Sequence, residues 1–166
     1  MEKQVLVIMG SDSDWPVMKK ALEVLRKFGV GFEARVASAH RTTEQALELA
    51  KKAHEVGYSV IIAGAGAAAH LPGVLAAVTP LPVIGVPING TALQGVDALY
   101  AMVQMPSGIP VATVAIDGAK NAALLAVQIL SVKENKLRQQ LIEYKRKMAS
   151  EVSEKDKKIQ QLVAEL

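Results

Sequence analysis

Short apolar runs alternate along the whole chain with longer segments in which apolar residues recur every three or four positions. The short runs are typical of β-strands, and the longer segments are typical of amphipathic helices. Runs such as Ser59–Ala63 show no alternation of apolar and polar residues, which indicates burial on both faces of a sheet. We expect strands at residues 4–9, 31–37, 59–63, 81–86 and 110–116, and helices at residues 14–28, 42–56, 68–78, 91–104, 120–130 and 134–150.

This order of elements predicts an α/β fold. Strands that are joined by helices run parallel in one sheet, and the helices cover both of its faces. The strand order that fits best is the doubly wound, flavodoxin-like one, which gives a five-stranded parallel sheet with a C-terminal helical extension. The length of 166 residues matches a single domain. We expect a sheet-and-helix core at residues 1–132 and a helical tail at residues 133–166.

Charged residues are distributed very unevenly. Residues 58–118 contain no Lys, Arg or Glu, and their only acidic residues are Asp97 and Asp117. Residues 133–166 hold nine Lys or Arg and six Asp or Glu. A domain of this size has too little interior to bury the whole neutral segment. Part of it, including the apolar helix expected at residues 91–104, should therefore lie in contacts between subunits.

The expected tail carries an apolar stripe from Leu137 to Met148. Ser153, with Asp156 three residues later, has the spacing of a helix start, so we expect a second helix to begin there. The stripe predicts packing contacts, which could include contacts with a neighbouring subunit.

Composition excludes several classes of site and partner. The chain has no cysteine, which excludes disulfides, thiolate zinc sites and iron–sulfur clusters. Its three scattered histidines predict no metal centre. A net charge of +3 without a basic patch predicts no nucleic-acid partner. No apolar stretch is long enough to predict a membrane span. We expect a soluble, cytoplasmic protein.

In such a sheet, ligands bind beyond the carboxyl ends of the strands, and the residues after the first expected strand carry suitable groups. Gly10 permits a tight turn, and Ser13 or Asp14 can cap the next helix. Hydroxyls and free amides at a helix start bind anions, so Ser11 and Ser13 favour a phosphate group. Asp14 would repel a phosphate but can accept hydrogen bonds from a sugar diol. A plain helix cap would use the same residues.

The second loop, Ser38–Thr42, places His40 beside Arg41 at a strand end. Arginine offers a permanent charge and a planar fork that fits phosphate. An imidazole can both donate and accept a proton near neutral pH. The pair therefore predicts phosphate binding and proton transfer, and the alternative is a capping loop with a solvated arginine.

The third loop, Gly64–Gly73, is rich in small residues that permit a ligand ring to approach the backbone closely. His70 could position the substrate or a loop. The segment contains the dinucleotide pattern G-x-G-x-x-A, but it follows the third strand and lacks an acidic residue about twenty positions later. A triad of Ser11, His40 and Asp14 would lack the strained turn that presents a nucleophilic serine.

These loops and two later segments resemble the class I 5-(carboxyamino)imidazole ribonucleotide mutase family, also described as the phosphoribosylaminoimidazole carboxylase catalytic subunit. The matching motifs are MGSDSDW (9–15), SAHRT (38–42), IIAGAGAAAHLPG (61–73), GVDALYAMVQMPSGIPVAT (95–113) and NAALLAVQIL (121–130). Together they span the chain from Val5 to about Leu130. Ala67 stands where the family commonly has Gly, and Thr43 stands where Pro is common. No motif covers the residues after Ser153.

The resemblance implies an isomerase of purine biosynthesis that needs no cofactor and no metal. Its substrate is a nucleotide whose carboxylate moves, through trapped carbon dioxide, from the exocyclic nitrogen to ring carbon 4. The family fold is a three-layer αβα sandwich, assembled as a homo-octamer with sites at subunit interfaces. By resemblance, His40 is the general acid and base. The expected substrate-binding residues are Ser11, Asp14, Arg41, Gly10, Ser13, Ser38, Gly64, Gly66, Ala67, His70 and Leu71.

Three other functions remain open. The class II enzyme carboxylates aminoimidazole ribonucleotide directly with carbon dioxide and uses overlapping pocket chemistry. A flavodoxin-like flavin carrier would need aromatic residues around the ring, whereas the only tryptophan, Trp15, lies beside a helix cap. A non-catalytic interaction domain would not depend on His40.

Overall fold

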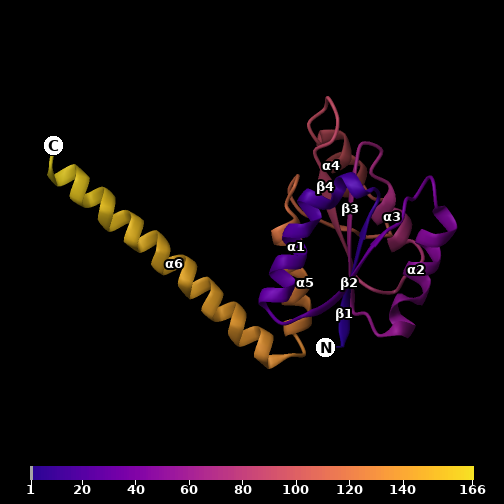
Figure 1. Ribbon diagram of the computed structural model, residues 1–166, viewed down its shortest axis with the longest axis horizontal. Coiled ribbons are helices and arrows are strands. Elements are labelled where there is room, and N and C mark those ends of the chain that lie inside the picture. Colours follow the sequence, from indigo (N-terminus) through magenta and orange to yellow (C-terminus); the bar gives the residue numbers. More distant parts are fainter. Residues whose placement is uncertain (1) are drawn as a thin grey trace. The chain divides into compact units, whose positions relative to one another are not determined.

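The computed structural model describes residues 2–166 and places five strands in one parallel sheet (Figure 1). The strand order is β2-β1-β3-β4-β5, and each neighbouring pair of strands is parallel. The strands are β1 (Lys3–Met9), β2 (Gly31–Val36), β3 (Val60–Gly66), β4 (Val83–Ile88) and β5 (Ala112–Thr113). The predicted flavodoxin-like sheet is confirmed.

Helices lie on both faces of this sheet. In Figure 1, α1 and α5 lie on one side of the strands, and α2 and α3 lie on the other. The helices are a single 3₁₀ turn, η1 (Asp12–Asp14), and α1 (Trp15–Lys27), α2 (Thr43–Val56), α3 (Leu71–Ala76), α4 (Val96–Val103), α5 (Ala119–Ser131) and α6 (Asn135–Ala164). The three-layer αβα architecture is therefore confirmed as well.

Small side chains let α2 pack closely on the sheet. Ala46, Ala50 and Ala53 recur at intervals of three and four residues, so they share one face of the helix, and each is at most 1% exposed. They belong to the same buried cluster as Leu6 and Ile8 of β1. This aliphatic core fixes the carboxyl ends of β1 and β2 relative to the start of α2.

The helix expected at residues 91–104 is shorter than its apolar pattern predicts. α4 begins only at Val96, because Gln94 and Gly95 have φ values of +53° and +86° and cannot continue a right-handed helix. Thr91 accepts a hydrogen bond from the Leu93 amide at 3.2 Å and forms a turn instead. The apolar periodicity therefore extends across a turn that precedes the helix.

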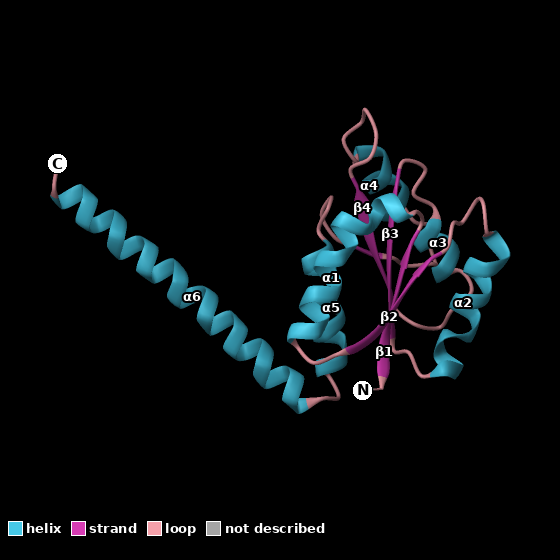
Figure 2. Cartoon of the chain, in the orientation of Figure 1, coloured by secondary structure: helices cyan, strands magenta, loops and turns pink. Residues whose placement is uncertain are grey.

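The chain divides into two compact units, residues 1–129 and residues 130–166. The second unit contains α6, which is one unbroken helix (Figure 2). The prediction of a helix end near Ser150 and a new start at Ser153 is wrong. Residues 135–164 contain no Gly or Pro to end the helix, and ion pairs such as Lys157–Glu154 support it.

Among residues 2–166, no helix combines the length and the apolar character that a membrane-spanning segment needs.

Candidate functional site

A cavity of about 430 Å³ lies where the carboxyl ends of β1, β2, β3 and β4 meet. This is the edge of the sheet at which doubly wound folds bind ligands. Each strand contributes the residues that directly follow it. The lining residues are Gly10, Ser11, Ser13, Asp14, Ser38, Ala39, His40, Arg41, Ala65, Gly66, Ala67, Ala68, Leu71, Ile88 and Gly90.

The loop after β1 is organised by reciprocal hydrogen bonds. The Ser11 hydroxyl accepts a hydrogen bond from the Ser13 amide at 3.3 Å, and the Asp14 carboxylate accepts one from the Ser11 amide at 3.0 Å. These two bonds form a capping box. The Ser13 hydroxyl lies 3.0 Å from that of Ser11, so two hydroxyls stand together at the start of η1 and α1.

Asp14 is the buried acid of the site, with only 7% of its surface exposed. Burial raises the pKa of its carboxyl above the usual value of 3.8, because the charged form loses contact with water. Hydrogen bonds from the Ser11 and Gly10 amides and the charge of Arg41 oppose this rise in pKa. A buried carboxylate with spare acceptor capacity is suited to bind neutral hydroxyl groups.

The loop after β2 presents His40 and Arg41. The Ser38 hydroxyl accepts hydrogen bonds from the His40 amide at 3.3 Å and the Arg41 amide at 3.1 Å. Thr42 closes the loop by accepting a hydrogen bond from the Ser38 amide at 2.8 Å. Arg41 reaches the first loop, where its Nη2 lies 3.5 Å from the Gly10 carbonyl oxygen. The sequence interpretation of these residues as neighbours in one site therefore fits the geometry.

Two histidines meet at the cavity although 30 residues separate them. His40 Nε2 lies 2.9 Å from His70 Nδ1, and the two rings are edge to face, with centroids 5.0 Å apart and an angle of 82°. One of these two nitrogens must carry the proton and the other must accept it. The contact fixes the orientation of the His40 ring.

Most of the predicted binding residues line the cavity, and two do not. Gly64 is buried within β3, where a Cβ would overlap the thioether of Met18, and its carbonyl accepts a hydrogen bond from the Gly10 amide at 3.1 Å. Gly64 therefore connects the carboxyl ends of β1 and β3 behind the cavity. His70 lies beside the cavity and touches it through His40.

Five lining residues are not among the predicted binding residues. Ala39, Ala65 and Ala68 lie within the predicted loops, whereas Ile88 and Gly90 lie outside them. Ile88 ends β4, and Gly90 follows it. The rule that ligands bind at strand ends applies equally to the fourth strand, so it could have indicated both. Neither residue carries an ionisable or hydroxyl group, so the sequence offers no chemical signal there.

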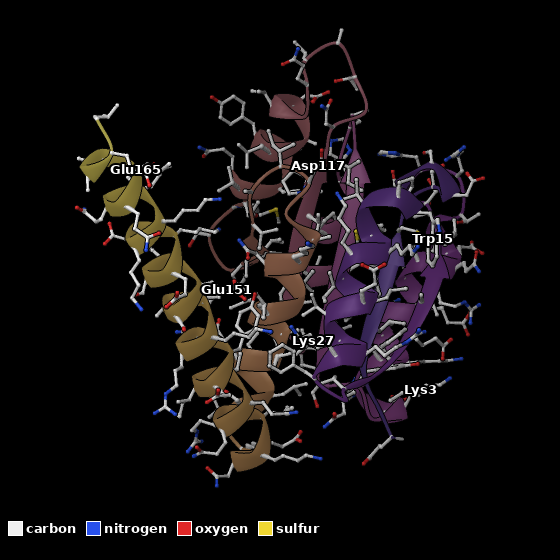
Figure 3. All side chains as sticks on the ribbon, turned by 60° about the vertical axis from the view of Figure 1, so that its left-hand side comes forward. Lys3, Trp15, Lys27, Asp117, Glu151 and Glu165 are labelled. Atoms are coloured by element: carbon white, nitrogen blue, oxygen red, sulfur yellow. The ribbon has the colours of Figure 1, made fainter. Side chains whose placement is uncertain are left out.

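A second hollow of about 490 Å³ adjoins the first and shares Gly10, Ser11, Ser38 and Arg41 with it. The polar groups of the two loops are thus accessible from both sides of Arg41. Trp15 lies beyond them at the surface, 46% exposed (Figure 3). Within the described part of the chain, no three His, Asp or Glu side chains group closely enough to hold a metal ion.

The family model described as AIR carboxylase matches residues 4–151. The chain belongs to this family. The match includes every residue that lines the cavity, and it ends thirteen residues before the last residue of α6.

Relatives in the family are similar along most of their length. The N5-carboxyaminoimidazole ribonucleotide mutase of Pyrococcus horikoshii is 59% identical over 94% of this chain and 88% of its own. The protein of that name from Thermotoga maritima is 54% identical over 96% and 93%, and that from Aquifex aeolicus is 65% identical over 80% of each. The crystal structure of Treponema denticola PurE is 30% identical, with a TM-score of 0.86 over 94% of this chain and 98% of its own.

Proposed function

We propose that this protein is a 5-(carboxyamino)imidazole ribonucleotide mutase, an isomerase of purine biosynthesis. The observation that carries the proposal is the meeting of an imidazole, a guanidinium and a buried carboxylate at one cavity, from His40, Arg41 and Asp14. Relatives that are 54–65% identical bear the name of this enzyme.

The nucleotide is held by the two polar loops. Arg41 and the hydroxyls of Ser11 and Ser13 anchor the phosphate, since a guanidinium fork and a helix start both favour an anion. Asp14 accepts hydrogen bonds from the ribose hydroxyls. Its burial makes these bonds stronger than they would be in water, because little solvent competes for the carboxylate.

His40 begins the reaction as an acid. Its imidazolium donates a proton to the exocyclic nitrogen while the bond between that nitrogen and the carboxyl carbon breaks. The electron pair of that bond stays on the nitrogen, and carbon dioxide is released within the cavity. His40 is left neutral.

The same imidazole completes the reaction as a base. Ring carbon 4 of the electron-rich aminoimidazole attacks carbon dioxide and forms the new carbon–carbon bond. Neutral His40 then removes the proton from carbon 4, which restores the aromatic ring and the imidazolium. No electron leaves the substrate, so the reaction as written requires no redox cofactor. Holding both fragments in one cavity replaces a bimolecular encounter.

The cavity must retain carbon dioxide after its release from the exocyclic nitrogen until it bonds to ring carbon 4. The small residues Gly66, Ala67 and Ala68 form one wall of the cavity, where little but backbone and methyl groups would contact the gas. His40 and Arg41 are exposed in the single chain. We therefore infer that neighbouring copies cover the site in a homo-octamer and exclude water from it.

The apolar surface of α4 supports such an assembly. Tyr100 is 61% exposed and Leu93, just before the helix, is 62% exposed, and Val96 and Val103 are also exposed. Clusters of this kind on a folded domain usually mark a surface that another protein covers.

We place the enzyme in the cytoplasm, with the other reactions of nucleotide synthesis.

Assays of the purified protein with two substrates test the proposal. We expect rapid conversion of 5-(carboxyamino)imidazole ribonucleotide to 4-carboxy-5-aminoimidazole ribonucleotide, and slow formation of that product from aminoimidazole ribonucleotide and bicarbonate. Rapid turnover of the second pair alone would instead assign the class II reaction. If the protein turns over neither substrate, an enzymatic role at this cavity is contradicted.

A further inference from the structure

Ala67 holds a backbone conformation that few alanines adopt. Its φ is +53°, in the left-handed region, where the Cβ crowds the backbone. Among the described non-glycine residues, only Ala67, Gln94 and Asp117 have a positive φ. Asp117 accepts a hydrogen bond from the Asn89 amide at 3.0 Å in this conformation. The methyl group of Ala67 can make no such compensating bond.

The strain lies in a turn whose two ends are firmly packed. Gly66 ends β3, where a Cβ would come within 3.1 Å of the Ile88 carbonyl oxygen. Ala69 is 1% exposed. Between them, Ala67 and Ala68 are exposed and line the cavity. The turn can therefore change shape at these two residues while its ends stay in place.

Two hydrogen bonds oppose the strain and hold the turn as observed. The Ala69 amide donates to the Ala67 carbonyl at 2.8 Å, and the His70 amide donates to the Ala68 carbonyl at 2.8 Å. Each bond joins residues two positions apart, which makes the turn very tight. A segment in which strain and hydrogen bonding oppose each other is suited to exist in two conformations.

We propose that Ala67 is a positioning residue that sets how often this turn moves away from the cavity to admit and release the nucleotide. In the closed conformation Ala67 is left-handed, as observed, and in the open conformation it relaxes to a common backbone region. The proposal rests on the proposed function for the identity of the ligand.

Glycine at position 67 would remove the strain and favour the closed conformation. It would do so almost equally in the free and the nucleotide-bound protein, because the strain lies in the backbone of the turn and glycine removes only one methyl group from the cavity wall. Association and dissociation would then slow by the same factor, while the dissociation constant would not change. A residue that only contacts the nucleotide would change the dissociation constant instead.

The test measures both rate constants for Ala67→Gly and the wild-type protein. The probe is 4-carboxy-5-aminoimidazole ribonucleotide, followed by rapid filtration of labelled nucleotide and by the fluorescence of Trp15, the only tryptophan and the neighbour of Asp14. We expect both rate constants to fall by about 5- to 30-fold, which corresponds to the cost of a left-handed residue. We expect the dissociation constant to stay within about twofold, since equal changes in both rates cancel.

Gln94→Gly is the matched control, because it relieves the same backbone conformation at an exposed residue that does not line the cavity. We expect its rate constants to match those of the wild type. Unchanged rate constants in Ala67→Gly, or a change confined to one of them, would overturn the proposal for Ala67 while leaving the mutase intact. Wild-type protein that neither binds nor converts the nucleotide would overturn both.

Discussion

Asp14 keeps a carboxyl group where water reaches it poorly. Burial raises its pKa, so the native protein binds this proton more tightly than the unfolded chain does. The stability of the native state therefore falls as pH rises from about the usual value of 3.8 through the raised pKa, and the loss is complete above the raised pKa.

Asp14→Asn removes this titration and leaves an amide oxygen that can still accept the hydrogen bond from Ser11. We expect the variant to gain stability relative to the wild type as pH rises, measured by denaturant unfolding at pH 4 and pH 7. We expect nucleotide binding to weaken by roughly 10- to 100-fold, the range for loss of a hydrogen bond to a charged group. Asp156, an exposed residue of α6, changed to Asn, serves as the control. Tight binding by Asp14→Asn would contradict the role in holding the ribose.

Arg41 provides the phosphate anchor in the proposed mechanism. Arg41→Ala should raise KM for the nucleotide by roughly 10- to 100-fold with a smaller effect on kcat, because a charge-assisted contact is lost in ground and transition states alike. Steady-state kinetics measure both constants. Arg35→Ala is the control, because Arg35 lies outside the cavity and pairs with Glu33, with 3.1 Å between Nη1 and Oε1. We expect this variant to leave KM unchanged. An unchanged KM in Arg41→Ala would show that the phosphate is bound elsewhere.

At the scale of elements, a polar cluster links the edge strand β2 to Lys3 of β1 and to Tyr58, which precedes β3. The Glu33 carboxylate accepts hydrogen bonds from Lys3 at 2.6 Å and from Tyr58 at 2.8 Å. These donors, with Arg35, lower the pKa of Glu33 to about 2. The pKa of Tyr58 is raised to about 12 by burial and by Glu33. The cluster stabilises the native state above the usual Glu pKa of 4.5, and this contribution is lost as pH falls toward 2.

Tyr58→Phe removes one donor from Glu33 without changing the ring. We expect a loss of about 1 to 2 kcal/mol in unfolding free energy at neutral pH. The difference from the wild type should shrink as pH falls from 4.5 toward 2, because Glu33 progressively loses its charge over this range and a neutral carboxyl is a weaker acceptor for the Tyr58 hydroxyl. Chemical denaturation at several pH values measures it. A difference that stays constant with pH would contradict the coupling to Glu33.

Helices and strands in which apolar residues recur at regular intervals are predictable from the sequence. Most of the residues that line the cavity are predictable as well. The strand-end rule predicts that Ser11, Asp14 and His40 lie together, because parallel strands end at one edge of a sheet. The turn at Gln94 and Gly95 is not predictable, since apolar residues on both sides of it keep a helical spacing. The continuity of α6 through Ser153 is missed because a capping pattern has no effect within a helix that nothing else ends.

The strand-end rule brings the loops together, but it does not predict which side chains of two loops contact each other. The 2.9 Å contact of His40 with His70 depends on how two loops fold, and neither loop carries a local signal for it. The positive φ of Ala67 likewise depends on the hydrogen bonds of its turn and on the packing of Gly66 and Ala69 at the ends of that turn, and an alanine by itself gives no indication of a left-handed residue.

For the whole molecule, the proposed mechanism requires that copies of the chain assemble. Tyr100→Glu places a charge on the exposed apolar surface of α4, where burial against another subunit would be costly. We expect a smaller assembly by analytical ultracentrifugation, an unchanged circular dichroism spectrum and at least a roughly tenfold loss of activity, since water would then enter the site. Gln160→Glu, at an exposed polar residue of α6, is a control for the added charge. An intact assembly in Tyr100→Glu would show that α4 is not the contact surface.

The central claim is that one imidazole donates a proton and then takes one back. The most direct measurement compares turnover and nucleotide binding in His40→Asn, with His54→Asn, an exposed histidine of α2 that does not line the cavity, as control. The mechanism predicts that His40→Asn binds the nucleotide within a few fold of the wild type but turns it over at least about 100-fold more slowly, the usual contribution of general acid–base catalysis. Turnover of His40→Asn close to that of His54→Asn would contradict it.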